Sequence, residues 1–258
     1  MTRTLKERLA AGETTIGSWL SWGFPPVAEV MARAGFEWLV VDMEHTAIGV
    51  AEMHHLVQVV SLAGVVPLVR VPLNEPVSIK HALDAGAHGV LVPQVSTPEE
   101  ASRAVAYAHY PPRGLRGAGL GRAQGYGLDF AAYREWADRE TVVIVQIEHI
   151  TGVRNLEGIL AVEGVDGFII GPYDLSASLG RPGDWHHADV RAALDEVARI
   201  VRSGPKPGGY HVVHSDHAEL EARLAAGYRF IAYGDDMVFF AEKVRAEAGH
   251  ALARGRQA

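Results

Sequence analysis

The sequence has 258 residues, of which 48% are hydrophobic and 21% are charged, and its formal net charge is −7. This length supports one large buried core, and the composition argues against a disordered chain. There is no basic stripe with interleaved aromatic residues, which argues against a nucleic-acid partner. The absence of cysteine excludes disulfides, thiolate catalysis and cysteine-bound metals, so a cytoplasmic location is the expectation.

The sequence also gives no sign of a membrane segment. Residues 1–8 lack the apolar run of a signal peptide, and no apolar stretch reaches the ~18 residues of a membrane-spanning helix. No low-complexity tract or linker interrupts the chain, and we expect a single domain over residues 1–258.

Eight short runs of β-branched and apolar residues recur along the chain. Some are apolar at every position, such as Val142–Val145, which is typical of strands buried on both faces of a parallel sheet. The predicted strands are Thr15–Leu20, Trp38–Asp42, Pro67–Val71, Gly89–Pro93, Val142–Glu148, Gly167–Gly171, Pro207–Val212 and Arg229–Tyr233.

Helical patterns alternate with these strands. Gly35, Gly86 and Gly227 each follow a helical segment at the position where a left-handed residue ends a helix, and Thr97-Pro98 marks a helix start. The predicted helices are Pro26–Ala34, Val50–Ala63, Pro76–Ala85, Thr97–His109, Gly152–Leu160, Ala188–Ser203, Asp216–Ala226 and Asp236–Arg254.

Eight strand–helix repeats predict a single-domain (β/α)8 TIM barrel. An open doubly wound sheet is the alternative, but no Gly-x-Gly-x-x-Gly motif follows the first strand. Residues 110–140, between strands four and five, form a long insertion rich in glycine, arginine and aromatic residues. An insertion of this length is typical of a lid, a binding loop or an oligomer contact.

Polar residues gather at the carboxyl ends of the predicted strands, where barrel enzymes carry their catalytic groups. The polar residues at or just beyond these ends are Asp42, Glu44, His45, Arg70, Gln94, Gln146, Glu148, His149, Tyr173, Asp174, His211, His214, Tyr233 and Asp235. The strand bodies are nearly all apolar, so this pattern predicts an enzyme.

Glu148 and Asp174 follow neighbouring strands, and two hard oxygen ligands with room for water suit Mg²⁺ or Mn²⁺. The structural alternative is that Glu148 pairs with a nearby cation. The sequence Gly171-Pro172-Tyr173-Asp174 predicts a tight turn whose backbone N–H groups can hold a carboxylate. Histidines on the predicted helices, and the His211-x2-His214-x2-His217 series, are not expected to bind the metal.

Arg70 ends a buried strand, a position where arginine needs an anionic partner. Its functional interpretation is a clamp on a substrate carboxylate or a developing oxyanion, and its structural alternative is a salt bridge to Asp42 or Glu44. His45 lies close in sequence to the same two acids. A histidine oriented by a carboxylate is a common general acid–base arrangement.

These residues resemble the motifs of the HpcH/HpaI family of class II, metal-dependent pyruvate aldolases, which are related to the citrate-lyase β-subunit. The matching motifs run from Gly17-x-Trp19 to the last helix and are Asp42-x-Glu44-His45, Val69-Arg70, Gln146-x-Glu148 and Gly171-Pro172-x-Asp174-Leu175-Ser176. The family includes 4-hydroxy-2-oxoheptanedioate and 2-keto-3-deoxy sugar acid aldolases.

The resemblance implies an aldehyde-lyase that cleaves a 4-hydroxy-2-oxo acid into pyruvate and an aldehyde through an enolate. Glu148 and Asp174 would hold the divalent metal, which would be Mg²⁺ or Mn²⁺, with Co²⁺ or Zn²⁺ as further options. Arg70 would stabilise the enolate, and His45 would accept and donate the proton.

The substrate would be seated by further residues that the resemblance supplies, which are Trp19, Gln146, Gly171, Pro172 and Tyr173. The resemblance also assigns Asp84 as the carboxylate that raises the basicity of His45. Because Asp84 lies near the end of its predicted helix, it would have to reach from a neighbouring subunit, and Asp42 is the nearer candidate within one chain.

The resemblance further implies a homohexamer, a trimer of dimers, with Asp236–Arg254 as a plausible exchanging helix. The chain departs from well-known members at Thr46–Gly49 and at His211–His214, on the side expected to face the aldehyde. The acceptor aldehyde therefore stays open.

Three alternatives remain. A Claisen-type lyase or synthase would act on an acyl-CoA or oxaloacetate, and Arg113, Arg116 and Arg122 offer cations for a CoA pyrophosphate. A barrel that only senses a 2-oxo acid would have no use for a general base. A Schiff-base aldolase would need a lysine at the rim, but only Lys206 borders a strand, at its entry.

Overall fold

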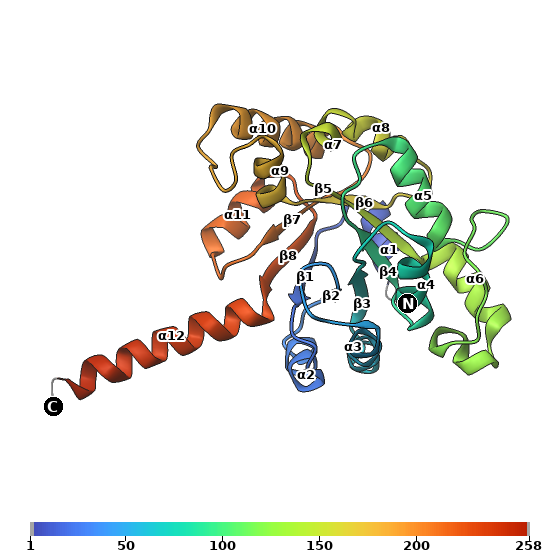
Figure 1. Ribbon diagram of the computed structural model, residues 1–258, viewed down its shortest axis with the longest axis horizontal. Coiled ribbons are helices and arrows are strands. Elements are labelled where there is room, and N and C mark those ends of the chain that lie inside the picture. The colour runs from blue at the N-terminus through green and yellow to red at the C-terminus, as the bar shows by residue number, and fades with distance from the viewer. Residues whose placement is uncertain (1–2, 257–258) are drawn as a thin grey trace.

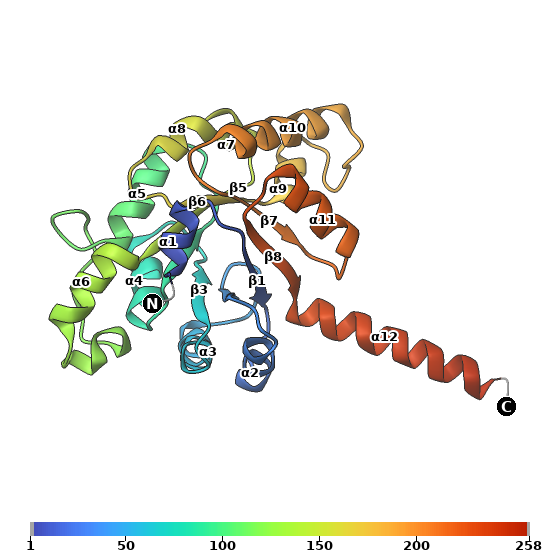
Figure 2. The ribbon, with the colours of Figure 1, turned by 180° about the vertical axis from the view of Figure 1, so that it is seen from behind.

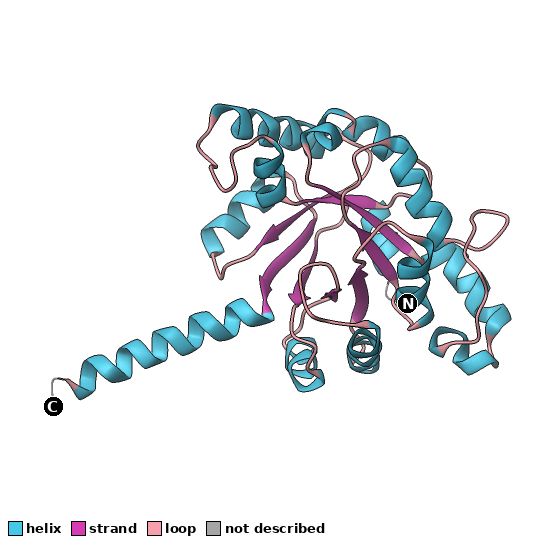
Figure 3. Ribbon diagram, in the orientation of Figure 1, coloured by secondary structure: helices cyan, strands magenta, loops and turns pink. Residues whose placement is uncertain are grey.

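The computed structural model describes residues 3–256 and shows a closed barrel of parallel strands in the order β1-β2-β3-β4-β5-β6-β7-β8. Figure 3 shows the strands at the centre with helices around them. The predicted (β/α)8 barrel is therefore confirmed. The strands are β1 Thr15–Leu20, β2 Trp38–Asp42, β3 Val66–Arg70, β4 Gly89–Val92, β5 Val142–Ile147, β6 Gly167–Ile170, β7 Gly208–Val212 and β8 Phe230–Asp235.

The helices follow the strands in the expected alternation, as Figure 1 shows. The three glycines predicted to end helices have φ values of 97°, 100° and 104°, and Thr97 forms a capping box with Glu100. The helices are α1 Leu5–Ala10, α2 Pro25–Arg33, α3 Val50–Leu62, α4 Pro76–Asp84, α5 Pro98–Ala108, η1 Arg122–Gly127, α6 Phe130–Glu140, α7 Ile150–Arg154, α8 Leu156–Ala161, α9 Pro172–Ser178, α10 Ala188–Ser203, α11 His217–Ala226 and α12 Asp236–Gly255.

Two apolar layers hold the barrel together. One lies between the strands and the surrounding helices, and the other fills the barrel interior, where the rings of Trp38 and Phe230 stack with their centroids 4.1 Å apart. Leu5 and Leu9 of α1 join the interior cluster and close the amino end of the barrel (Figure 2). The opposite end, where the strands finish, is left for the polar residues.

Several elements differ from the sequence-based expectation. The short helix α1 was not predicted, and the 110–140 insertion is less irregular than expected because it contains η1 and α6. The single helix predicted over Gly152–Leu160 is two helices that meet at Asn155, and the turn predicted after β6 continues into α9. These differences change no strand, so the carboxyl rim is placed as expected.

Helix α12 extends away from the barrel (Figure 1). Phe240, Val244 and Leu252 on this helix are exposed. Their spacings of four and eight residues place them on one side of the helix. Among the described residues, no helix is both long enough and apolar enough to cross a membrane.

Candidate active site

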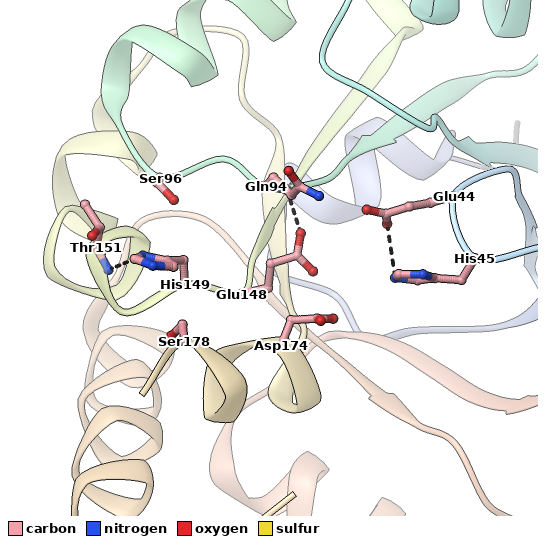
Figure 4. A pocket seen from close by; sticks show the side chains of 9 residues that line it. All are labelled: Glu44, His45, Gln94, Ser96, Glu148, His149, Thr151, Asp174 and Ser178. Atoms are coloured by element: carbon pink, nitrogen blue, oxygen red, sulfur yellow. Dashed lines mark hydrogen bonds and ion pairs between the residues drawn. The ribbon is translucent and has the colours of Figure 1, made fainter. Parts of the chain in front are cut away.

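The polar residues predicted at the rim surround a cavity with two lobes at the carboxyl end of the barrel. The first lobe has a volume of about 500 Å³ and the second about 270 Å³. His45 and Asp174 line both lobes. Figure 4 shows the first lobe, with Glu44 and His45 on one side and the carboxylates of Glu148 and Asp174 in the middle.

Asp42 and Arg70 end the neighbouring strands β2 and β3 in direct register. Arg70 donates from Nη2 to Asp42 Oδ2 at 2.6 Å and from Nε to Asp42 Oδ1 at 2.8 Å. Burial raises the pKa of Asp42, but the hydrogen bonds and charge of Arg70 outweigh it and hold this pKa below its ordinary value. The structural alternative for Arg70, a salt bridge, is thus present, and it leaves one end of the guanidinium free.

That end is Nη1, which is free only of the Asp42 pair and points toward the cavity residues. It lies 3.3 Å from Glu44 Oε2 and 3.4 Å from Gln146 Oε1. Because Asp42 occupies the other donors, Arg70 is held in a fixed orientation with Nη1 available to an incoming anion.

Glu44 is the carboxylate next to the His45 ring. Its Oε2 lies 3.7 Å from His45 Nε2, whereas Asp42 accepts hydrogen bonds from Arg70 and from the backbone N–H groups of residues 44 and 45 but not from the His45 ring. Burial and the neighbouring carboxylates raise the pKa of Glu44 to about 7. The His45 side chain is 57% exposed, so substrate and water both have access to it.

Glu148 ends β5 and is fixed by two amides. The backbone N–H of Gln94 donates to Oε1 at 2.6 Å, and the Gln146 side chain donates to Oε2. Gln94 adopts a left-handed φ of 56°, an uncommon conformation that aims its N–H at this carboxylate. Burial, reinforced by Asp174, raises the pKa of Glu148. No cation pairs with Glu148 among the described residues, so the salt-bridge alternative for this residue does not hold.

Gly171 lets α9 approach Glu148 closely. A Cβ at this position would lie 2.9 Å from Glu148 Cβ and 3.0 Å from Glu148 Oε2. Helix α9 then places Asp174 in its first turn, on the same cavity.

These carboxylates fit a divalent cation. Glu44 Oε2 is fully enclosed but makes no hydrogen bond, and burial together with the neighbouring acids raises the pKa of both Glu44 and Glu148. Within residues 3–256, no group of three or more potential ligand side chains has metal-binding geometry. A site built on Glu148 and Asp174 therefore leaves positions for water and substrate oxygens, as hard cations prefer.

The second lobe is mainly apolar on the side opposite these acids. Trp19 of β1 lies beneath Arg70, whose guanidinium carbon is 5.1 Å from the ring centroid. His211 of β7 stacks on Trp19 with ring centroids 4.7 Å apart. Gly171, Pro172 and Tyr173, which the resemblance assigned to substrate binding, also line this lobe.

Comparisons with known proteins match this architecture to one family. Residues 15–242 match the family described as HpcH/HpaI aldolase/citrate lyase. The chain belongs to this family.

Named relatives within the family are aldolases. The chain is 42% identical to a hydroxypyruvate/pyruvate aldolase of Roseobacter denitrificans over 237 residues, which cover 91% of each chain. It is 39% identical to a 5-keto-4-deoxy-D-glucarate aldolase of Shigella dysenteriae over 236 residues, again 91% of each chain. These similarities make the chain an aldolase-type carbon–carbon lyase.

The fold comparison agrees. An HpcH/HpaI aldolase/citrate lyase family protein from Burkholderia cenocepacia has a TM-score of 0.90 to this chain at 36% sequence identity, with 97% of this chain and 99% of that chain covered. The HpcH/HpaI barrel therefore extends over nearly the whole chain.

Two predicted site residues, Asp42 and Asp84, do not line the cavity; Asp42 contacts the cavity residue Arg70, whereas Asp84 lies elsewhere. It ends α4, beside the amino end of the barrel, where Arg116 donates to its Oδ1 at 2.7 Å and Gln124 donates at 3.3 Å. Within one chain, then, Asp84 does not contact His45. The tentative partner Asp42 does not contact the His45 ring either, because its oxygens bind Arg70 and backbone amides.

Three contributors to this HpcH/HpaI cavity were placed at the rim by the sequence analysis but were not assigned to the site. They are the carboxylate of Glu44 beside the imidazole, the backbone N–H of Gln94, and the ring of His211. A signal for His211 did exist, because it lies one residue before the end of a strand and shares a face with Gly209 and Val213 in the period of two.

Proposed function

We propose that this enzyme is a class II aldolase that cleaves a 4-hydroxy-2-oxo acid into pyruvate and an aldehyde, and that it also catalyses the reverse addition. One observation carries the proposal: Glu148, Asp174, Arg70 and His45 converge on one cavity at the carboxyl rim. The names of the relatives support the same reaction.

Glu148 and Asp174 would hold a divalent cation, for which Mg²⁺ or Mn²⁺ suits two carboxylate ligands and water. When bound, the cation supplies Lewis-acid polarisation of the substrate's keto oxygen. Gln94 and Gln146 position Glu148 for this role, because each donates to a different carboxylate oxygen.

His45 would act as the general base and acid. Its imidazole removes the proton of the C4 hydroxyl, the C3–C4 bond breaks, and its electrons form the enolate as the aldehyde leaves. The same imidazole then returns the proton to C3. Glu44, 3.7 Å from Nε2, positions this ring.

Arg70 Nη1 would bind the oxygen that becomes negative in the enolate. Because Asp42 fixes the other guanidinium donors, the charge is oriented before the substrate arrives, which is the arrangement that lowers the barrier most. Trp19 supports the guanidinium from below.

The cations that favoured an acyl-CoA substrate do not reach this cavity within one chain. Arg116 binds Asp84, Arg122 donates to the carbonyl of Ala85, and Arg113 donates to the carbonyl of Asp138, all in or beside the insertion. The aldolase is therefore the better supported function.

We also propose that the enzyme is a homo-oligomer, with a hexamer of three dimers as the expected form. Helix α12 leaves the barrel, and an apolar hollow of about 440 Å³ lies between its first turn and α2. Trp22, Val27, Val30 and Phe239 line this hollow. The exposed face of α12 from a second copy supplies the apolar surface that would cover it.

The function is tested by pyruvate release from a racemic 4-hydroxy-2-oxo acid, coupled to lactate dehydrogenase. We expect release with Mg²⁺ or Mn²⁺ and none with EDTA, and a loss of about 10³-fold or more in Glu148→Gln or His45→Gln. Both variants would be checked for an unchanged far-UV circular dichroism spectrum. Release of free CoA from an acyl-CoA, without pyruvate release, would contradict the proposal.

A further inference from the structure

The wall of the second lobe contains one polar ring among apolar side chains. Trp19, Ile169 and Val213 give this wall its apolar surface, and His211 lies between them. Neither the proposed chemistry at the metal ligands nor the proton transfer at His45 uses this ring.

His211 is held in one orientation. Its ring stacks on Trp19 with an interplanar angle of 13°, and its Nε2 lies 2.9 Å from the carbonyl oxygen of Gly234. Ser18 Oγ donates to the same carbonyl at 3.2 Å. Since a carbonyl only accepts, Nε2 carries the hydrogen.

The position of that carbonyl is itself fixed. Gly234 has a φ of 71°, and a Cβ there would fall 1.9 Å from the ring of Phe239. Only glycine therefore fits, and the carbonyl keeps its direction toward His211.

The second ring nitrogen is left to accept a hydrogen bond. Burial lowers the pKa of His211, with a smaller contribution from Arg70, so the ring is neutral near pH 7 and Nδ1 carries a lone pair. Nδ1 makes no hydrogen bond to any residue of the described range 3–256. Both ring nitrogens of His109 are buried atoms without a hydrogen-bond partner, whereas Nδ1 of His211 is not one of these buried atoms.

We propose that His211 is a specificity residue whose Nδ1 accepts a hydrogen bond from a hydroxyl next to the carbonyl of the substrate, so that the enzyme favours α-hydroxy carbonyl compounds. This inference rests on the proposed aldolase function. The fixed tautomer selects a donor, and Arg70, which lies over Trp19, disfavours a cationic amine at the same place. A neutral hydroxyl is the donor that remains.

A hydroxyl next to a carbonyl can occur in either of the two compounds that the enzyme joins. The hydroxyl can belong to the 2-oxo acid, as in hydroxypyruvate compared with pyruvate, or to the aldehyde, as in glycolaldehyde compared with acetaldehyde. Each pair differs by this one hydroxyl, so the two pairs separate the two sources.

The test compares two sets of variants. His211→Phe keeps an aromatic ring against Trp19 without an acceptor, and His211→Leu is a second acceptor-free variant with a different shape. His211→Asn keeps an acceptor oxygen near the position of Nδ1 but loses the stacked ring. For each we would measure the ratio of kcat/KM between the hydroxylated and plain member of both pairs, with Mn²⁺ present.

We expect the ratio for one pair to fall about 5- to 10-fold in His211→Phe and His211→Leu, the size of one neutral hydrogen bond, and to be largely kept in His211→Asn. The pair that responds identifies the source of the hydroxyl. An unchanged ratio for both pairs in the two acceptor-free variants would overturn the inference and leave His211 as part of the wall only.

A binding measurement separates this inference from the aldolase proposal. Calorimetry with Mn²⁺ would compare the affinities for hydroxypyruvate and pyruvate, and glycolaldehyde and acetaldehyde would be compared as competitors. If no variant and no wild-type protein turns over any pair, the aldolase proposal fails, and the affinity ratios alone decide whether His211 selects the hydroxyl. Equal affinity ratios in the wild type and in His211→Phe would then overturn the inference that His211 selects the hydroxyl.

Discussion

Asp42 and Arg70 face each other across the ends of β2 and β3, joined by hydrogen bonds of 2.6 and 2.8 Å that leave only Nη1 of the guanidinium directed at the cavity. Both side chains are nearly buried. This pair explains how the guanidinium of Arg70, at a buried strand end, is held in a fixed position before an anion binds. It also makes the site and the stability of the barrel depend on each other.

Asp42→Asn therefore lowers stability as well as activity. The change leaves the buried Arg70 without its carboxylate partner, and we expect the free energy of unfolding to fall by about 3 kcal/mol. Urea denaturation followed by tryptophan fluorescence measures this. Glu29→Gln is the matched control, because the Glu29–Arg33 pair lies on the surface and its loss changes the free energy by less than about 0.5 kcal/mol. Equal effects of the two substitutions would refute the account of Asp42.

Gly171→Ala tests the close approach of α9 to Glu148. The added Cβ would collide with Glu148 Cβ and Oε2, so the carboxylate must move away from Gln94 and Gln146. We expect Mn²⁺ to bind about 10- to 100-fold more weakly, measured by calorimetry. Gly249→Ala on α12, where an added Cβ meets nothing within 4 Å, is the control and should bind Mn²⁺ as the wild type does. Wild-type affinity in Gly171→Ala would show that Glu148 does not need this packing.

His109 makes stability depend on pH. Its ring is buried with neither nitrogen hydrogen-bonded, and burial together with Arg113, Lys6 and Arg116 lowers its pKa to about 4, from 6.5 in the unfolded chain. Between pH 6.5 and 4 the unfolded state thus binds more protons than the folded state. The free energy of unfolding therefore falls as the pH falls through this window. The loss at pH 5 is on the order of 2 kcal/mol relative to pH 7.

His109→Leu removes the titrating ring and should flatten this part of the stability profile, measured by urea denaturation at pH 7 and pH 5. His250→Gln, a change on an exposed part of α12, should leave the profile of the wild type. If His109→Leu loses as much stability as the wild type between the two pH values, other groups control the acid sensitivity.

Phe240→Glu combined with Val244→Glu tests the role of α12 in assembly. The two carboxylates would enter the apolar face that we propose is covered by a second copy, and we expect light scattering to report monomers of about 28 kDa. Ala246→Glu, which lies on the opposite side of the same helix and is exposed, should keep the assembly. A wild-type protein that is already monomeric would contradict the proposed oligomer.

Much of the fold follows from local patterns. The bounds of β1, β2 and α10 agree with those predicted, because short runs of mainly apolar residues and clear helix ends are local signals. Helix α1 was missed although Thr4 and Glu7 form a capping box, since six residues show too little periodicity. The insertion was expected to be a long loop because its glycines obscure α6.

The site was predictable as a set of residues at strand ends but not in its pairings. Sequence spacing alone places Asp42, Glu44 and His45 together. Only the side-chain directions show that Arg70 pairs with Asp42 and that the imidazole faces Glu44. The position of Asp84 follows from the end of its helix, and whether it serves another copy depends on assembly. His211 was recognised at the rim from the sequence, but its stacking on Trp19 of β1 depends on the closure of the barrel and could not be predicted.

The central claim is most directly tested by hydrogen–deuterium exchange of the pyruvate methyl group in D2O, followed by proton NMR. This half-reaction requires enolate formation but no aldehyde, so the unknown acceptor does not enter. The account predicts that the methyl signal disappears with Mg²⁺ or Mn²⁺ and enzyme, and that EDTA, Glu148→Gln or His45→Gln prevents the loss. If pyruvate and metal bind the wild-type enzyme but the methyl protons do not exchange, the proposed chemistry is wrong.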